Sequence, residues 1–280
     1  MEYKTLNDGN KIPMIGLGTY RINPADAERA VKIALANGYT SIDTANVYFN
    51  EEAVGRGIKA SGVDRSKLFV TSKIFPTVFD DFDKAVEDTL RRLQLDYLDL
   101  LLLHRPYGDY LSAYSRLLNA RKKGLVRSVG VSNFTLEQIE ELHEKTGVYP
   151  AINQIELNVE RGREKEQPQF EGKGVAVESW FPFGGNAKLL DDPVIEEIAG
   201  KLGKSPAQIV LNYLIDRGVI VIPGSKTESH IKDNLDVFSF SLTEDEKAAL
   251  AKLSRKKPHG DLFGPLTYRF LKKDYFEKKN

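Results

Sequence analysis

The chain of 280 residues contains no cysteine and only four histidines. The absence of cysteine excludes disulfide bonds, thiolate nucleophiles and sulfur-ligated metal sites. The four histidines are scattered without the spacing of a metal site, so the sequence predicts no metal ligand. A chain without cysteine is typical of a reducing compartment, and we expect cytoplasmic localisation.

An excess of charge of one sign is also missing. The 40 Lys and Arg residues balance the 40 Asp and Glu residues, so the formal net charge is zero. We therefore expect neither nucleic acid nor an anionic membrane as a partner. No apolar run approaches the roughly 20 residues that cross a bilayer, and the opening residues, MEYKTLNDGNKIP, do not resemble a secretory signal. The sequence predicts a soluble protein.

What is present is a regular alternation of apolar runs and amphipathic segments. Helices are predicted over 26–37, 82–93, 191–203 and 205–217, between Thr135 and Gly147, and from Asn50 onward. Continuously apolar strands separated by helices are typical of a parallel sheet that is covered by helices. The predicted strands are 14–18, 41–43, 68–73, 98–104, 126–132, 151–157, 175–180 and 219–223.

Eight such units without an intervening linker predict an α/β fold, one (β/α)₈ TIM barrel that spans residues 1–280. Asp8-Gly9 predicts a β-hairpin before the barrel, and one of the two helices between the last two strands is expected to be an extra helix. Residues 254–280 are interpreted as a C-terminal tail over the barrel mouth. A doubly wound open sheet is the alternative, but GLGTYR lacks the third glycine of a dinucleotide-binding fingerprint.

Polar residues stand at or near the ends of the apolar strands. In a barrel, the carboxyl ends of the strands meet at one mouth, where active sites form. Each residue alone has an ordinary explanation, such as a loop cap for an aspartate or packing for a tyrosine. The set comprises Asp43, Lys73, His104, Ser132, Asn133, Gln154 and Trp180, with Tyr48 on the loop after Asp43.

Together, four of these residues form a coherent device for proton delivery. Tyrosine has an ordinary pKa near 10, so a tyrosine acid needs its pKa lowered, and a neighbouring lysine cation can do this. We expect Lys73 to lower the pKa of Tyr48, Asp43 to hold Lys73, and His104 to orient and polarise a carbonyl oxygen.

The chain resembles the aldo-keto reductase superfamily, most closely its bacterial branch similar to 2,5-diketo-D-gluconate reductase. The similarity covers residues 4–254. It rests on the motifs GYTSIDTANVYFNEEAVG, LDYLDLLLLHRP, GLVRSVGVSNF, NQIELN, DDPVIEEIAGKLGKSPAQIVLNYLIDRGVIVIPGS and IKDNLDVFSFSLTEDE.

The resemblance implies NADPH-dependent reduction of aldehydes or ketones, with small carbonyl compounds, keto sugars or keto acids as substrates. It implies a catalytic tetrad of Asp43, Tyr48, Lys73 and His104. The implied cofactor-binding residues are Gly18, Thr19, Asp43, Ser132, Asn133, Gln154, Trp180, Pro182, Phe183, Gly184, Ile222, Pro223, Gly224, Ser225, Lys226, Thr227, His230 and Asn234. The implied substrate-binding residues are Tyr20, Tyr48, Phe49, Phe75, His104 and Arg105.

Two segments depart from the family pattern. In IPGSKTESH, Gly224 and His230 replace the lysine and arginine that the family uses at the adenosine phosphate. Since a phosphate is best held by Lys or Arg, we expect NADPH with a reduced preference over NADH. Arg105 follows His104 where the family commonly has tryptophan, and it either points away from the pocket or favours anionic substrates.

Two other functions remain open from the sequence. A barrel aldolase would use Lys73 as a Schiff-base former, which requires an unpaired and desolvated lysine. A regulatory barrel would bind the cofactor without turnover. The resemblance also suggests a monomer whose partner is a small-molecule carbonyl substrate.

Overall fold

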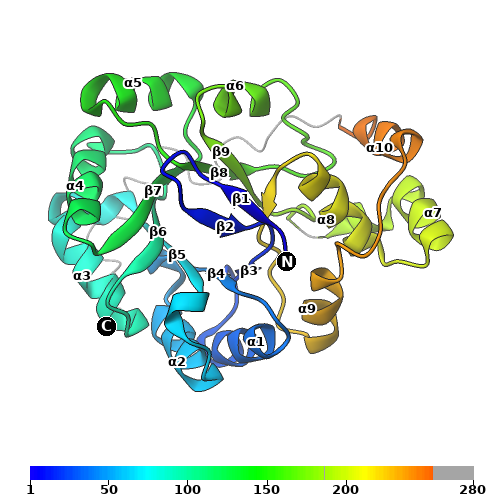
Figure 1. Ribbon diagram of the computed structural model, residues 1–280, viewed down its shortest axis with the longest axis horizontal. Coiled ribbons are helices and arrows are strands. Elements are labelled where there is room, and N and C mark those ends of the chain that lie inside the picture. Colours follow the sequence, from blue (N-terminus) through cyan, green and yellow to red (C-terminus); the bar gives the residue numbers. More distant parts are fainter. Residues whose placement is uncertain (186, 255–280) are drawn as a thin grey trace.

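The computed structural model describes residues 1–185 and 187–254. Within them, eight parallel strands form one sheet in chain order: β3 (Leu17–Gly18), β4 (Ser41–Asp43), β5 (Phe69–Ile74), β6 (Leu98–Leu103), β7 (Val126–Ser132), β8 (Ile152–Glu156), β9 (Ala176–Trp180) and β10 (Ile220–Val221). Figure 1 shows the strands curling around a common centre with helices outside them. The predicted (β/α)₈ fold is confirmed.

The first and last strands meet and complete the ring. Gly16 donates a backbone hydrogen bond to the Val221 carbonyl at 2.9 Å, and Gly18 donates one to Pro223 at 3.2 Å. A Cβ atom at Gly18 would lie 2.6 Å from the Ile222 carbonyl oxygen. Glycine is therefore required where the two backbones come this close. We call this contact of residues 16–18 with residues 221–224 the seam.

The strands are apolar on both faces because both faces are covered. Every residue of β6, sequence LDLLLL, is buried. Its apolar side chains pack either into the barrel centre or against the surrounding helices, as parallel strands of this kind require. Asp99, the single acid in β6, forms ion pairs with Arg65 at 2.7 Å and Arg127 at 3.2 Å.

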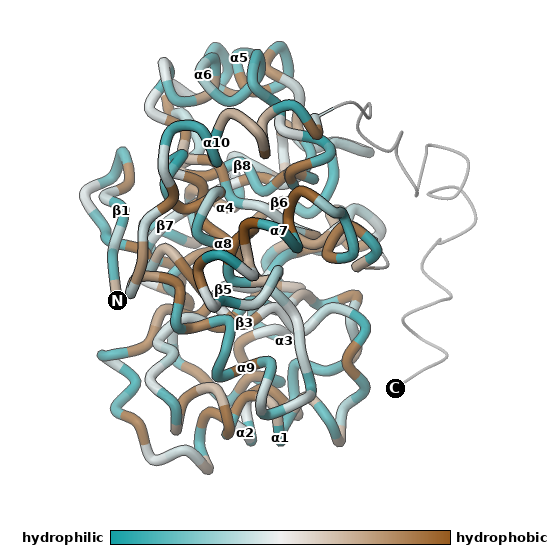
Figure 2. Tube along the Cα trace, turned by 90° about the vertical axis from the view of Figure 1, so that its right-hand side faces the viewer, coloured by the Kyte–Doolittle hydropathy of each residue, from teal (hydrophilic) through white to brown (hydrophobic). Residues whose placement is uncertain are grey.

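An antiparallel hairpin of β1 (Tyr3–Thr5) and β2 (Lys11–Pro13) precedes the barrel, as predicted. Gly9 takes a φ of +86° in its turn. Asn10 Nδ2 donates to Ser128 Oγ at 2.9 Å, at the amino-terminal end of β7. Figure 1 shows the hairpin over the centre of the ring, and Figure 2 shows β1 at one edge of the molecule. The hairpin therefore covers the end of the barrel opposite the strand carboxyl ends.

The helices of the described residues are α1 (Pro24–Ala36), α2 (Glu51–Ser61), α3 (Phe82–Leu93), α4 (Tyr110–Lys122), α5 (Leu136–Thr146), α6 (Gln167–Glu171), α7 (Pro193–Leu202), α8 (Pro206–Asp216), α9 (Glu228–Leu235) and α10 (Glu244–Ala251). The predicted helices all form. Thr135 and Ser205 cap α5 and α8 with reciprocal capping boxes. Helix α7 packs on α8 and α10 at the outside of the ring, and it is the extra helix of the predicted pair.

Helices α4, α6, α9 and α10 were not predicted from the sequence. Helix α4 follows β6 after a short connection and begins at Tyr110. The sequence does not reveal α4 because its inward face is built largely from small and aromatic side chains, which give a weak apolar stripe. The predicted tail lies, apart from Ser254, outside the described residues. No helix in the described ranges has the length and apolar character needed to cross a membrane.

Candidate active site

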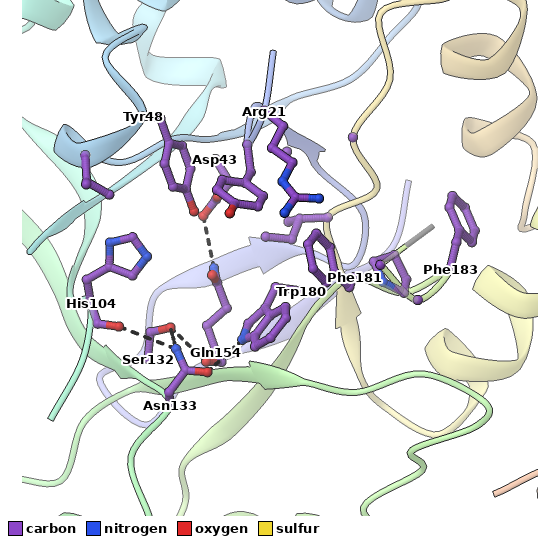
Figure 3. A pocket seen from close by; sticks show the side chains of 18 of the residues that line it. Arg21, Asp43, Tyr48, His104, Ser132, Asn133, Gln154, Trp180, Phe181 and Phe183 are labelled. Atoms are coloured by element: carbon purple, nitrogen blue, oxygen red, sulfur yellow. Dashed lines mark hydrogen bonds between the residues drawn. The ribbon is translucent and has the colours of Figure 1, made fainter. Parts of the chain in front are cut away.

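A cavity of about 590 Å³ lies at the carboxyl ends of the strands. It is lined by all the polar strand-end residues named above except the buried Lys73. Figure 3 shows the side chains of Tyr48, Asp43, His104 and Trp180 arranged around it. The fold therefore brings the strand-end residues together at one mouth of the barrel, as predicted.

Lys73 lies beneath the floor of this cavity and holds two predicted partners. Its Nζ atom is 2.5 Å from Asp43 Oδ1, and it donates to the Tyr48 hydroxyl at 3.4 Å and to the Thr44 carbonyl at 2.9 Å. The Lys73 side chain has no solvent exposure. Burial disfavours the Lys73 cation, but Asp43 and Tyr48 together outweigh burial and raise its pKa. Lys73 and Asp43 therefore form a buried ion pair.

The pKa of Tyr48 differs from the sequence-based expectation. Burial raises this pKa to about 12, and the positive charge of Lys73 offsets only part of the rise. The expected net lowering by Lys73 is wrong, because desolvation of a buried phenolate outweighs one cation at 3.4 Å. The Tyr48 hydroxyl is consequently protonated at neutral pH, which is the form that a general acid needs.

His104 is buried beside Tyr48. The two ring centroids are 5.7 Å apart at an interplanar angle of 76°, and Phe75 packs edge-on against the other side of the imidazole. Burial lowers the pKa of His104 well below its usual range, with further lowering by Lys73 and Arg105. The imidazole is therefore neutral at neutral pH, and it can donate one hydrogen bond to an oxygen in the cavity.

A second polar group lies across the cavity. Asn133 Nδ2 donates to Ser132 Oγ at 2.8 Å, and Trp180 Nε1 donates to Asn133 Oδ1 at 2.9 Å. Ser132 Oγ in turn donates to the backbone carbonyl of Gln154 at 2.9 Å. Asn133 takes a φ of +64°, a region that asparagine tolerates better than most residues. The network fixes amide groups and a flat indole ring at one edge of the cavity (Figure 3).

Gln154 connects this group to the ion pair. Its Nε2 atom donates to Asp43 Oδ2 at 3.0 Å and to Glu178 Oε2 at 2.8 Å. Glu178 is buried in the middle of β9 and was not predicted as a site residue, because the predicted set lies at the carboxyl ends of the strands. A single acid inside the otherwise apolar strand VAVESW was the signal that could have found it.

The sequence also missed part of an aromatic and cationic wall. Phe181 lies between Tyr20 and Trp180, with ring centroids 5.8 and 5.0 Å away, and Arg21 stacks over both Tyr20 and Phe181. Arg21 and Phe181 both take positive φ values. Such conformations on loops cannot be read from residue periodicity. Figure 3 shows Arg21 pointing into the cavity, where it can hold an anion.

The other predicted residues divide into two groups. The cavity lining includes the predicted Gly18, Pro182, Phe183, Gly184, Ile222, Gly224, Tyr20, Phe75 and Arg105, and the unpredicted Val47, Gly185 and Ala187. The predicted Thr19, Phe49, Pro223, Ser225, Lys226, Thr227, His230 and Asn234 lie outside the lining. Thr19 and Asn234 are buried, and Lys226 forms an exposed ion pair with Asp26 at 3.3 Å.

The donor set fits a nicotinamide dinucleotide. Such a cofactor presents a flat ring with a carboxamide, which matches the Trp180 indole and the neighbouring amide groups of Asn133 and Gln154. It also presents phosphates, for which Arg21 lies on the cavity wall. Within the described ranges, no group of three or more His, Cys, Asp or Glu residues could hold a metal ion. The arrangement therefore favours organic cofactor chemistry with a tyrosine acid.

Comparisons with known proteins agree with this arrangement. The model of the aldo/keto reductase family matches residues 14–255. Methylglyoxal reductase DkgA of Escherichia coli (strain K12) is 40% identical over 266 residues, which cover 92% of this chain and 97% of the relative.

Two solved structures are similar along nearly their whole length. The aldo/keto reductase from Brucella melitensis superimposes with a TM-score of 0.87 at 39% identity, covering 90% of this chain and 99% of the other. The Bombyx mori aldo-keto reductase in complex with NADP gives a TM-score of 0.88 at 38% identity, covering 94% and 95%.

Proposed function

Because the chain belongs to the aldo/keto reductase family, we propose that it is an NADPH-dependent reductase of aldehyde and ketone carbonyls. The observation that carries this proposal is the hydrogen-bonded series Asp43, Lys73 and Tyr48 at the floor of a cavity that also holds His104. When bound, the reduced nicotinamide supplies the hydride that reaches the carbonyl carbon.

The residues of this chain position and protonate the carbonyl oxygen. His104, neutral because of its lowered pKa, donates a hydrogen bond to the oxygen and orients it. Tyr48 carries its proton at neutral pH and gives it to the developing alkoxide. Lys73, held by Asp43, stabilises the phenolate that remains on Tyr48.

Ser132, Asn133 and Gln154 would hold the nicotinamide carboxamide, and the Trp180 ring would lie against the nicotinamide. Arg21 would contact the phosphates, and the segment from Ile222 to His230 would hold the adenosine end. The Bombyx mori relative is described in complex with NADP, which supports NADPH as the cofactor of this chain as well.

A small carbonyl compound is the proposed substrate. The cavity of about 590 Å³ must hold the nicotinamide and the substrate together, which leaves room for a small molecule only. The E. coli relative is named a methylglyoxal reductase, and methylglyoxal is a small ketoaldehyde. Arg105 on the cavity wall extends the proposal to keto acids.

The Schiff-base aldolase is disfavoured by the ion pair itself. A Schiff-base lysine must lose its proton to attack a carbonyl, whereas Asp43 raises the pKa of Lys73 and occupies its ammonium group. Lys73 also lies below the cavity floor, with no solvent exposure.

The decisive experiment is the variant Tyr48→Phe, assayed by nicotinamide absorbance with methylglyoxal, other aldehydes, keto sugars and keto acids. We expect kcat to fall by about 10³-fold, in the range of general acid catalysis, while the Kd for NADPH changes little. Tyr110→Phe, which removes a hydroxyl from the surface pair with Glu141, is the control. Full turnover in Tyr48→Phe, or a wild-type protein that binds NADPH and reduces no carbonyl, would refute the proposal.

A further inference from the structure

Glu178 is a buried acid that the mechanism above does not use. It lies on β9 beside Gln154 of β8 in the parallel register, and two residues before Trp180. Only 1% of Glu178 is exposed to solvent. Burying a carboxyl group inside an apolar strand costs free energy unless the group makes a useful hydrogen bond. The bond that Glu178 makes is the one it accepts from Gln154.

The two carboxyl groups on either side of Gln154 determine how its amide is turned. Asp43 Oδ2 and Glu178 Oε2 both lie within 3.0 Å of the same nitrogen, Gln154 Nε2. Asp43 is ionised by its pairing with Lys73, and an ionised carboxylate can only accept hydrogen bonds, so the amide nitrogen must face Asp43. The second hydrogen of the same nitrogen then points to Glu178 Oε2, which accepts it. The carbonyl oxygen Oε1 is then the atom of the Gln154 side chain left to meet a ligand in the cavity that Gln154 lines.

We propose that Glu178 is a positioning residue, which holds the Gln154 amide so that its Oε1 atom accepts the N–H of the nicotinamide carboxamide. The inference rests on the proposed function, because it assumes that the cavity binds a nicotinamide. Without Glu178, one Nε2 hydrogen of Gln154 loses its acceptor and the amide can rotate. With Glu178, Gln154 joins the cofactor site to Asp43 and, through Asp43, to Lys73.

A neutral side chain at position 178 can also accept the hydrogen bond from Gln154 Nε2. The charged and polar groups around Glu178 are Asp43 on β4, Lys73 on β5 and Gln154 on β8. Burial and the charge of Asp43 raise the pKa of Glu178 to about 8, so the group is largely protonated at neutral pH. A protonated carboxyl group still accepts through its carbonyl oxygen. Glutamine at this position has the same shape and the same acceptor, whereas leucine has none.

The test separates the two halves of the cofactor. The Kd values of NADPH and of adenosine 2′,5′-bisphosphate, which lacks the nicotinamide, are measured by calorimetry for the wild type, Glu178→Leu and Glu178→Gln. We expect Glu178→Leu to weaken NADPH by about tenfold, the value of one well-placed hydrogen bond, and to leave the bisphosphate unchanged. Glu178→Gln should bind both ligands within a factor of three of the wild type.

A cofactor analogue tests the same point without any substitution. Reduced 3-acetylpyridine adenine dinucleotide phosphate carries an acetyl group in place of the carboxamide and has no N–H to donate. The wild type should bind it about tenfold more weakly than NADPH, and Gln154→Leu should abolish that difference. In a Glu178→Leu protein that folds, the difference should also be abolished.

Three results would overturn the inference, and one would concern the proposed function instead. Equal affinity of the wild type for NADPH and the acetyl analogue would show that Gln154 does not accept from the carboxamide. Unchanged NADPH binding in Glu178→Leu, or an equal loss of both ligands, would show that Glu178 does not act on the nicotinamide half. A wild-type protein that binds no NADPH at all would refute the proposed function itself.

Discussion

The ammonium group of Lys73 lies 2.5 Å from Asp43 Oδ1, and the Lys73 side chain has no exposure to solvent. Asp43 is itself 2% exposed, so both charges are removed from water. The pair is stabilised by three further hydrogen bonds, from Lys73 to Thr44 and Tyr48 and from Gln154 to Asp43. A buried charge keeps its ionised form only when such partners are in place.

Removing one partner of this pair should therefore cost more than removing both. We expect Asp43→Leu to lower the free energy of unfolding by about 3–5 kcal/mol, because Lys73 is left buried without its counter-charge. The double variant Asp43→Leu/Lys73→Met should recover at least half of that loss. Urea unfolding of Asp43→Leu, Lys73→Met and the double variant measures these changes in the free energy of unfolding.

Carbonyl reduction should be absent from all three variants, including the stabilised double variant. A double variant that is less stable than Asp43→Leu would contradict the expectation, because it would show that the pair contributes through packing rather than charge.

Much of the fold follows from the residues because the barrel strands are buried almost throughout, on both faces. The runs LDLLLL and VRSVGVS correspond to β6 and β7 almost residue by residue, since Arg127 is the one exposed residue of these two strands and neither strand has a solvent face. Helix α4 could not be predicted in this way, because small and aromatic residues form much of its inward face. Helices α9 and α10 are eight residues each, too short to show a convincing helical period.

Glu178 should make the stability of the wild type fall as the pH rises from about 5 to 8. Its pKa is about 8 in the folded protein, against the ordinary value of 4.5. Between these values the folded protein holds a proton that the unfolded chain releases, so ionisation favours unfolding. Glu178→Gln has no such proton. Relative to the wild type, this variant should gain up to about 3 kcal/mol across this pH range.

Urea unfolding at four pH values between 5 and 8 measures the difference between the two proteins. Glu197→Gln is the matched control, because Glu197 is exposed and its pKa is lowered by Lys201, so it is ionised throughout. A constant difference between Glu178→Gln and the wild type would contradict the raised pKa of Glu178.

Lys226 should carry most of the remaining preference for NADPH. It lies two residues after Gly224, which together with His230 replaces the basic residues of the family, and its side chain is 62% exposed in an ion pair with Asp26. We expect Lys226→Ala to lower kcat/KM for NADPH about tenfold with little effect on NADH, as for one charge-assisted hydrogen bond.

Lys232→Ala is the control for this substitution, since Lys232 is an exposed lysine of α9 that pairs with Glu228. His230→Arg should raise the preference for NADPH. A very large NADPH preference in the wild type that survives Lys226→Ala would show that other groups hold the 2′-phosphate.

Arg105 should distinguish carboxylated from neutral substrates. It lines the cavity next to His104, with its guanidinium carbon 5.9 Å from the centre of the Trp180 ring. We expect Arg105→Leu to raise KM about tenfold for a 2-keto acid and much less for methylglyoxal, because only the acid can pair with the guanidinium group. Arg105→Lys, which keeps the charge, should lose less. Equal losses on both substrates would show that Arg105 acts only through packing.

The polar residues of the candidate site were accessible to sequence reasoning for a geometric reason. Strand carboxyl ends converge, so Asp43, Lys73, His104 and Gln154 could be placed together without coordinates. Arg21 and Phe181 could not, because loop backbone with positive φ turns their side chains inward. The pKa of Tyr48 could not be predicted either, since its direction depends on how completely the fold removes the hydroxyl from water.

The seam has a consequence for protein synthesis. Gly18, Ile222 and Gly224 stand on the two sides of the seam, and all three line the cavity. A nascent chain whose residue 224 is still inside the ribosome lacks one wall of the cavity, although the tetrad residues have long emerged. The catalytic residues therefore cannot retain a cofactor until the seam forms, and the seam joins residues that are about 200 positions apart in the sequence. Cofactor capture should then coincide with the last step of ring closure.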